Sequence, residues 1–256
     1  MWNRIDYGWR WFATAFSFFM FGLGGILVPI VVIPILYLLP GSTVQKQQRG
    51  QRFIHYAFRT FIGMMASLGV LTYEVKHRTK LQDAKLVLAN HPTLLDIVFL
   101  ISIIPNASCI VKSALVRNPF TWGPIKLAGY IINDDDADNV LALAKTAFNK
   151  NHALVVFPEG SRTTPHQQTT LKRGAANIAI RTQVDISPVL IQCTPLTLTK
   201  MHRWYQIPKK RMHFYIEIKD KIMISPYLES KTPSKGARQL TRDLSQYFNQ
   251  EIELRE

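Results

Sequence analysis

Long apolar stretches dominate the first part of the chain. Residues 11–39 form 29 consecutive positions without a charged residue, and a bilayer span needs about 20 such positions. Aromatic residues near both ends are candidate interfacial anchors, and two prolines inside the run predict a kink or a break. These residues are Trp2, Trp9, Trp11 and Tyr37, with Pro29 and Pro34 inside. The run therefore predicts a membrane helix or a re-entrant hairpin. A cleaved signal peptide fits less well, because its apolar core is about 7–15 residues long.

A second apolar helix is predicted over residues 53–73, where Arg59 is the single charged residue before Glu74. Its apolar positions recur at helical spacing over a wide face. We interpret it as a second membrane-associated helix, and an ordinary core helix of the following domain is the alternative. The sequence thus divides into N-terminal membrane-anchoring helices, 1–73, which are expected to form a membrane-associated helical hairpin, and a second domain, 74–256.

From residue 70 onward, short β-rich runs alternate with helical patterns. Such alternation predicts an α/β fold with a largely parallel mixed sheet flanked by helices, in which functional groups follow the carboxyl ends of the strands. The predicted strands are 70–77, 85–89, 107–112, 153–157, 186–193 and 212–219. The predicted helices are 92–103, 119–128, 137–150, 170–182 and 234–249.

The charge is strongly positive and unevenly distributed. The formal net charge is +14, and residues 46–85 and 200–242 together account for all of it. A basic block beside an apolar anchor favours attraction to anionic membrane lipid, although a solvated face is the simpler interpretation of any charge run. Nucleic acid is not an expected partner, because no groove-reading motif or pattern of cations interleaved with exposed aromatics is present.

Cysteine usage and charge placement bear on location. Cys109 and Cys193 are 84 positions apart and show no metal-binding spacing or disulfide framework. The cations crowd the C-terminal side of the apolar run, as expected for a cytoplasmic side. We therefore expect a membrane protein whose second domain lies at the cytoplasmic face of the cell (inner) membrane.

The first candidate site follows the predicted strand 85–89, where residues 90–96 read Asn-His-Pro-Thr-Leu-Leu-Asp. Pro92 is suited to the first position of a helix, which would place His91 at the cap and Asp96 one turn inside. With His91 outside the helix, its ring is free to fold back toward the Asp96 carboxylate. The pair predicts a general base oriented by a carboxylate, and a hydrogen-bonded structural histidine is the alternative.

The second candidate site follows the strand 153–157, where residues 157–162 read Phe-Pro-Glu-Gly-Ser-Arg. The exposed amides of this turn and Arg162 are suited to a phosphate or a carboxylate, and Lys172 and Arg173 bring further cations to a helix start. A surface turn with a weak Glu159–Arg162 pair is the alternative. Ser161 is not in a Gly-x-Ser-x-Gly pattern, so no hydrolase serine is predicted.

Together the two segments resemble the His-x4-Asp and Phe-Pro-Glu-Gly-(Ser/Thr)-Arg blocks of the glycerolipid acyltransferase family, which includes lysophosphatidic acid acyltransferases. Their order and separation also match. Weaker matches are residues 111–115, Val-Lys-Ser-Ala-Leu, and 186–190, Ile-Ser-Pro-Val-Leu. The resemblance covers roughly residues 70–220.

The resemblance implies acyl transfer from a thioester, either acyl-CoA or acyl carrier protein, to a lipid hydroxyl at a membrane. It implies that His91 is the general base and Asp96 its orienting partner. The resemblance and the neighbouring cations give the expected acceptor-binding residues, which are Glu159, Gly160, Ser161, Arg162, Lys112, Lys172 and Arg173. No metal and no cofactor other than the acyl donor is expected.

The acceptor remains open between two classes of lipid. Family members that use glycerol phosphates usually carry an arginine after a Gly-x-x-x-Ile strand, whereas residues 133–138 here read Asn-Asp-Asp-Asp-Ala-Asp. This acidic run is interpreted as a helix-capping loop rather than a metal site, because it lacks calcium-loop spacing. A lysophospholipid such as 1-acyl-glycerol-3-phosphate is the leading acceptor, and a glycolipid or another hydroxylated lipid is the second. A non-catalytic protein that binds anionic lipid is a third hypothesis.

Overall fold

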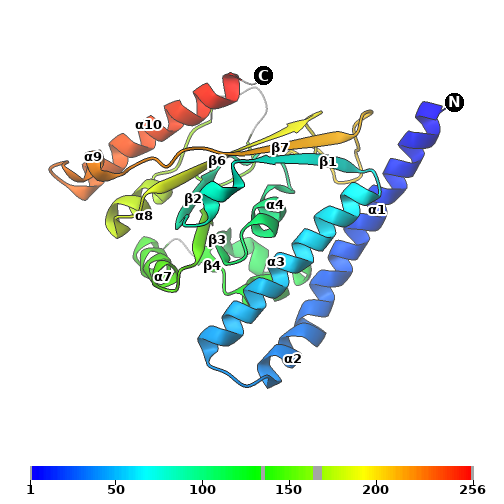
Figure 1. Cartoon of the computed structure of the whole chain (residues 1–256), viewed down its shortest axis with the longest axis horizontal. Helices are drawn as coiled ribbons and strands as arrows, with labels where there is room; N and C mark the ends of the chain where they lie inside the picture. The colour runs from blue at the N-terminus through cyan, green and yellow to red at the C-terminus, as the bar shows by residue number, and fades with distance from the viewer. Residues whose placement is uncertain (1, 134–135, 164–168, 255–256) are drawn as a thin grey trace.

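A computed structural model describes residues 2–133, 136–163 and 169–254, and its helices and strands are labelled in Figure 1. The side chain of Trp2 and residues 134–135 of the acidic run lie outside the described part. The helices are α1 (Trp2–Leu27), α2 (Ile33–Leu38), α3 (Thr43–Ser67), α4 (Asp96–Ile103), α5 (Ser113–Val116), α6 (Pro119–Ala128), α7 (Ala137–Asn149), α8 (Gly174–Thr182), α9 (Ser225–Leu228) and α10 (Pro233–Glu253). The strands are β1 (Leu71–Lys76), β2 (Leu86–Ala89), β3 (Ala107–Lys112), β4 (Ile131–Asn133), β5 (Ala153–Val156), β6 (Ile186–Thr194) and β7 (Met212–Ile218).

One seven-stranded sheet has the order β1-β7-β6-β2-β5-β3-β4. Strands β6, β2, β5, β3 and β4 are parallel to one another, whereas β7 pairs antiparallel with β6 and parallel with β1. The predicted largely parallel mixed sheet is therefore confirmed. Residues 90–96 and 157–162, called the first and the second motif below, follow β2 and β5. Because these two strands are adjacent and parallel, the two motifs begin at the same edge of the sheet.

Helices cover both faces of the sheet, as Figure 1 shows. Alternate residues of β2 point to opposite faces, so Val87 and Ala89 join the core under α3 and α4, and Leu86 and Leu88 join the core under α7, α8 and α10. All four side chains are buried, which explains why this strand is a continuous apolar run.

Several elements differ from the sequence-based expectation, and one of them is α3, which spans Thr43–Ser67 rather than residues 53–73. Strand β4 was not among the predicted strands, and with three residues it is too short to show periodicity. Strand β1 lies at a sheet edge with mostly exposed side chains, and the predicted domain boundary between residues 73 and 74 falls inside it. Helix α8 begins at Gly174 rather than at residue 170, and Leu171 to Arg173 lead into it.

The N-terminal apolar run forms a continuous helical rod and not a re-entrant hairpin. A π-helical turn, η1 (Val28–Val32), connects α1 to α2, and the Ile33 amide donates to the Val28 carbonyl within it. A proline removes one helical hydrogen bond and crowds the preceding turn, and the wider π turn accommodates Pro29 without a break. The hairpin is instead completed by α3, which runs back alongside α1 and α2 in Figure 1.

Among the described residues, one helical segment, Arg4–Leu38, is long and apolar enough to cross a membrane. Only 11% of its most apolar window is buried inside the protein, so most of its side chains face outward. Trp9, Trp11 and Tyr37 are among the exposed large side chains.

Helix α3 packs on the sheet domain along one face. Ile54, Phe61 and Met65 are buried, and α3 contacts α4 and α6. Two buried polar side chains also fasten it: the Gln51 Nε2 donates to the Ala128 carbonyl at 3.2 Å, and His55 Nδ1 bonds the Ile101 carbonyl at 2.7 Å. This face of α3 therefore corresponds to the core-helix alternative.

Two neighbouring glycines on α1 give a matched stability test. A Cβ built on Gly25 would overlap the Phe120 carbonyl oxygen of α6, whereas a Cβ on Gly24 would meet nothing within 4 Å. Gly25→Ala is expected to destabilise the contact between α1 and α6 by roughly 1–3 kcal/mol, as overpacking does. Gly24→Ala is expected to stabilise by about 0.5–1 kcal/mol because alanine favours a helix interior. Thermal unfolding of both variants in detergent measures the change in stability. Equal shifts of the unfolding temperature in the two variants would contradict the close approach of Gly25 to Phe120.

Candidate active site

The end of β2 is held in place by a side chain. Asn90 Nδ2 donates to the Ile191 carbonyl and the Ile191 amide donates to Asn90 Oδ1, both at 2.8 Å. The buried Asn90 amide group thus bonds the backbone of the neighbouring strand β6 just after β2 ends. Because both its donor and its acceptor are used, the position of the next residue, His91, is fixed relative to the sheet.

His91 and Asp96 form a direct contact. The distance from His91 Nδ1 to Asp96 Oδ2 is 2.7 Å, which confirms that the histidine ring folds back toward the carboxylate. The Thr93 amide also donates to Asp96 Oδ2 at 2.7 Å, and the Thr93 hydroxyl donates to Oδ1 at 2.5 Å. Asp96 therefore holds both the ring and the turn that leads into α4.

The expectation that Pro92 begins the helix is wrong. Helix α4 begins at Asp96, and Leu95 is its cap residue. The carboxylate of Asp96 reaches back to Thr93, so residues 91–95 form a turn rather than a first helical turn. This turn brings His91 and Asp96 together although a regular helix would place residues five positions apart on different faces.

Asp96 is fully buried. Burial raises the pKa of Asp96, and the hydrogen bonds from His91 and Thr93 oppose this effect without cancelling it. Because Asp96 Oδ2 lies 2.7 Å from His91 Nδ1, the carboxylate is positioned to accept the Nδ1 proton, and the second ring nitrogen, Nε2, is the one available as a base.

Phe157, the first residue of the second motif, had no predicted role, and it is part of the site. Its ring stacks on the His91 imidazole with the ring centroids 4.0 Å apart and an interplanar angle of 19°. The ring therefore restricts the rotation of the imidazole from one side while Asp96 holds one edge of it.

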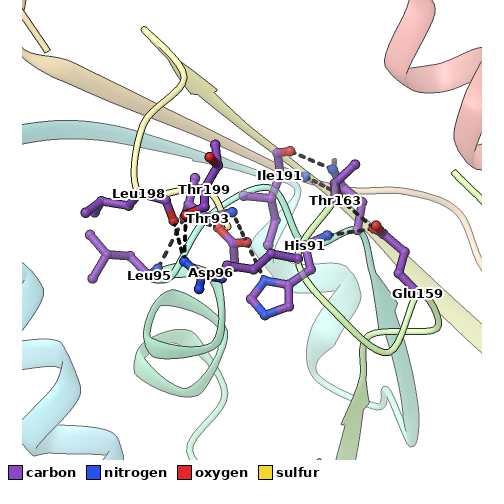
Figure 2. A network of polar contacts seen from close by, with 11 residues as sticks. His91, Thr93, Leu95, Asp96, Glu159, Thr163, Ile191, Leu198 and Thr199 are labelled. Atoms are coloured by element: carbon purple, nitrogen blue, oxygen red, sulfur yellow. Dashed lines mark hydrogen bonds and ion pairs between the residues drawn. The ribbon is translucent and has the colours of Figure 1, made fainter. Parts of the chain in front are cut away.

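Glu159 connects the two motifs. Its Oε1 accepts from the His91 amide at 3.0 Å and from the Thr163 hydroxyl at 2.9 Å, and the Thr163 amide donates to the His91 carbonyl at 2.7 Å. Figure 2 shows Glu159 and Asp96 on opposite sides of His91. Burial raises the pKa of Glu159, and the hydrogen bonds from Thr163 and His91 oppose the rise.

Arg162 joins the second motif to the connection between β6 and β7. Its Nη1 donates to the carbonyls of Leu198 and Thr199, each at 2.9 Å. Leu198 also accepts from the Leu94 amide at 3.0 Å, so the same carbonyl bonds both motifs. Within the described part of the chain no carboxylate pairs with Arg162.

Gly160 makes a close approach possible in this turn. Its φ is +69°, and a Cβ there would lie 3.0 Å from the side-chain carbons of Lys172. The Lys172 amide donates to the Pro158 carbonyl at 2.8 Å, so this lysine is adjacent to the turn, as expected.

The three other predicted acceptor-binding residues lie on separate elements. Lys112 is exposed at the end of β3, next to β5 on the same edge of the sheet, and Arg173 is exposed at the start of α8. Ser161 is half-buried in the turn between Gly160 and Arg162. For these three side chains, no hydrogen bond to His91 or Asp96 is present among the described residues.

Several residues of the site were not predicted as site residues. Asn90, Thr93, Phe157 and Thr163 lie within or beside the two motifs, so their proximity in sequence was the available signal. No sequence signal indicated the carbonyls of Leu198 and Thr199, because every residue type carries a backbone carbonyl and these two lie in a distant segment. In the described ranges no group of three or more histidine, cysteine or acidic side chains is arranged to hold a metal ion.

Glu159→Gln is expected to change the pH dependence of stability. A pKa that is raised in the folded state means that folding favours the protonated carboxylic acid. The contribution of protonated Glu159 to stability is therefore complete below pH 4.5, the ordinary pKa of a glutamate, and is lost as pH rises. Glutamine keeps an oxygen for His91 and Thr163 without a charge. The variant should therefore lose less stability than the wild type as pH rises above 4.5. Chemical unfolding over a pH series measures the difference, and Glu229→Gln, at an exposed glutamate, is the control.

The part of the chain that carries this site is similar to known acyltransferases. Residues 71–192 match the Acyltransferase family model. A 1-acyl-sn-glycerol-3-phosphate acyltransferase from Helicobacter pylori is 35% identical over 114 residues, which are 42% of this chain and 48% of that protein. The human 1-acyl-sn-glycerol-3-phosphate acyltransferase beta is 27% identical over 59% of this chain and 54% of its own length. The chain thus spans about half the length of these relatives.

The fold also has a solved counterpart. A crystal structure of the 1-acyl-sn-glycerophosphate (LPA) acyltransferase from Thermotoga maritima superposes with a TM-score of 0.72 at 17% identity, covering 99% of both chains. At this identity the similarity establishes the fold, including an N-terminal helical part and a sheet domain. The family match over residues 71–192 and the named relatives confirm the resemblance to the glycerolipid acyltransferase family that the two motifs indicated.

Proposed function

We propose that the protein transfers a fatty acyl group from an acyl thioester to the hydroxyl of a lysophospholipid such as 1-acyl-glycerol-3-phosphate. The observation that carries this proposal is the His91–Asp96 contact at the sheet edge, with Nδ1 held at 2.7 Å and Nε2 left for a substrate. The names of the relatives support the same acceptor.

In the proposed reaction, His91 Nε2 removes the proton of the acceptor hydroxyl as its oxygen attacks the thioester carbonyl. The new C–O bond forms, the tetrahedral intermediate collapses, and the C–S bond breaks. The departing sulfur takes the proton from the imidazolium, so free acyl-carrier thiol and an ester are released. Asp96 stabilises the transient imidazolium, and no enzyme-bound acyl group is required. Acyl-CoA and acyl carrier protein are both suitable donors.

The acceptor phosphate is assigned to the turn that contains Arg162. Arg162 Nη1 donates to two backbone carbonyls. A guanidinium has five N–H donors in total, so further donors are left for an anion. The described acidic residues after β4 have local partners: Asp136 caps α7, and Asp138 pairs with Arg181 at 3.6 Å. Because these carboxylates already have partners in the protein, they do not favour an acceptor that lacks phosphate.

Membrane attachment is assigned to the segment Arg4–Leu38, whose apolar side chains are mostly exposed. The proposed location is the cytoplasmic face of the cell (inner) membrane, because the basic residues follow the apolar segment. There the site can receive a lipid acceptor from the membrane and a thioester donor from the cytoplasm.

Arg162→Lys tests the acceptor assignment. Hydrogen bonds to a charged group contribute about 1.5–3 kcal/mol, so the KM for lysophosphatidic acid should rise roughly 10- to 100-fold. Acylation of a monoacylglycerol without phosphate should change much less. The assay supplies labelled acyl-CoA or acyl carrier protein to the full chain in vesicles with a panel of lyso-lipids.

Arg181→Lys is the matched control, since Arg181 is a surface arginine on α8. An equal loss on both acceptors would mean that Arg162 acts only by holding the 198–199 carbonyls. Acylation of a glycolipid but of no phosphate-bearing acceptor would overturn the proposed substrate class.

A further inference from the structure

The connection between β6 and β7, residues 195–211, has an unusual charge. It contains five lysine or arginine residues and no aspartate or glutamate. These cations are Lys200, Arg203, Lys209, Lys210 and Arg211, and all are exposed. Across the described residues, none of the five forms an ion pair with a carboxylate. We call residues 195–211 the β6–β7 loop.

The same loop exposes large apolar side chains. Met201 is 77% exposed, Trp204 45% and Tyr205 39%. The Trp204 and Tyr205 rings make an edge contact with centroids 5.5 Å apart, and Arg203 Nη1 donates to the Tyr205 hydroxyl at 2.7 Å. No cations interleaved with exposed aromatics were expected from the sequence, and this loop corrects that expectation. Exposed aromatics beside cations that lack a carboxylate partner are typical of a membrane interface, where rings sit at headgroup depth and cations meet anionic lipid.

The β6–β7 loop packs directly against α1. Arg10 is buried, and its guanidinium donates to the Pro208 carbonyl at 2.9 Å and to the Lys209 carbonyl at 2.6 Å. Two turns further along α1, the Phe18 ring lies 5.6 Å from the Trp204 ring. In Figure 1 the loop lies at the α1 side of the molecule, whereas α9 and the start of α10 lie at the opposite end. The loop is therefore continuous with the surface proposed to enter the membrane.

The loop also reaches the active site. Leu198 and Thr199 accept hydrogen bonds from Arg162, and Leu198 accepts one from Leu94 in the His91 turn. The exposed side chains of Met201 and Trp204 lie within a few positions of these carbonyls. A membrane that binds Met201 and Trp204 would therefore lie close to Arg162 and its side of the active site.

We propose that the β6–β7 loop is a second membrane contact, which rests on the anionic lipid surface beside α1 and opens the acceptor side of the site at that surface. The partner is a bilayer that contains anionic phospholipid. This proposal rests on the proposed membrane attachment by α1 and is independent of acyl transfer.

Single labelled cysteines test the contact in the full chain. Both native cysteines are buried, so an environment-sensitive fluorophore can be attached selectively to Met201→Cys. Phe19→Cys reports on the exposed face of α1, and Gln239→Cys reports on the exposed face of α10. On vesicles of phosphatidylcholine and phosphatidylglycerol, the labels at 19 and 201 should show an apolar shift and the label at 239 should not.

The other outcomes separate the two proposals. A shift at 19 without one at 201 would overturn the loop contact and leave attachment by α1 intact. No shift at either position would overturn membrane attachment and the loop contact together. A shift of equal size at 239 would show unspecific adsorption and also overturn the proposal.

Charge removal gives a second measurement. In the loop, Lys209→Gln, Lys210→Gln and Arg211→Gln are combined; at the opposite end, Lys231→Gln, Lys235→Gln and Arg238→Gln make the same charge change on exposed residues. The measured quantity is the preference of the full chain for anionic over neutral vesicles, in which the apolar contribution of α1 cancels. The loop triple should reduce this preference by up to about 100-fold. Equal effects of the two triples would contradict the proposal.

Discussion

Replacing His91 by alanine is expected to reduce acyl transfer by about 10²- to 10⁴-fold, the usual contribution of a positioned general base. The ring of His91 makes the hydrogen bond to Asp96, whereas its backbone makes the bonds to Glu159 and Thr163. Alanine removes the base and keeps those backbone bonds. The two motifs should therefore remain joined, and the loss should be chemical rather than structural.

The measurement is the initial rate of labelled ester formation by the full chain in vesicles, together with its thermal unfolding. His213→Ala is the matched control, because His213 is an exposed histidine on β7 that bonds Thr72. Wild-type rates in His91→Ala would refute the mechanism. A loss of the same size in His213→Ala would show that the assay reports general damage.

Replacing Asp96 by asparagine is expected to reduce the rate by about 10²-fold or more while the protein stays folded. The amide oxygen can occupy the place of Oδ2, where it accepts from Thr93 N and His91 Nδ1, and the amide nitrogen can face the Thr93 hydroxyl. The geometry of the turn is thus preserved. What is lost is the negative charge that stabilises the imidazolium in the transition state.

The double variant tests whether the two residues act as a unit. If Asp96 acts only through His91, then combining Asp96→Asn with His91→Ala should cost no more than His91→Ala alone. Asp185→Asn is the matched control, since Asp185 also accepts from a backbone amide, that of Ile224 at 3.0 Å. Additive losses in the double variant would assign Asp96 a separate role.

The other variants test parts of the molecule that the His91 and Asp96 variants leave intact. They are the alanine variants of Gly24 and Gly25, Glu159→Gln and Arg162→Lys. Gly25 tests how α1 is held against α6, and Glu159 tests the link between the motifs. Arg162 tests the recognition of the acceptor. Their expected effects on stability and KM are smaller than the loss of rate at His91.

Local pattern was sufficient for much of the fold. Strand β2 is buried on both faces, so its residues had to be apolar, and the alternation of such strands with amphipathic helices predicted the layered sheet. The His91–Asp96 pair was also predictable, because both residues lie in one short turn. In contrast, the start of α4 was predicted wrongly, since Pro92 suits a first helical position but Asp96 bonds back to Thr93 and closes a turn first.

The amino-acid sequence alone shows which chemical groups the chain holds and in what order: a histidine with a carboxylate, then a glutamate turn with an arginine, behind an apolar segment. How these groups meet depends on the folded chain. The parallel pairing of β2 with β5 brings His91 to Glu159 across 68 positions, and Arg162 meets carbonyls 36 and 37 positions away. Periodicity and spacing describe neighbours along the chain, whereas contacts between separate loops depend on strand order, which the whole core determines.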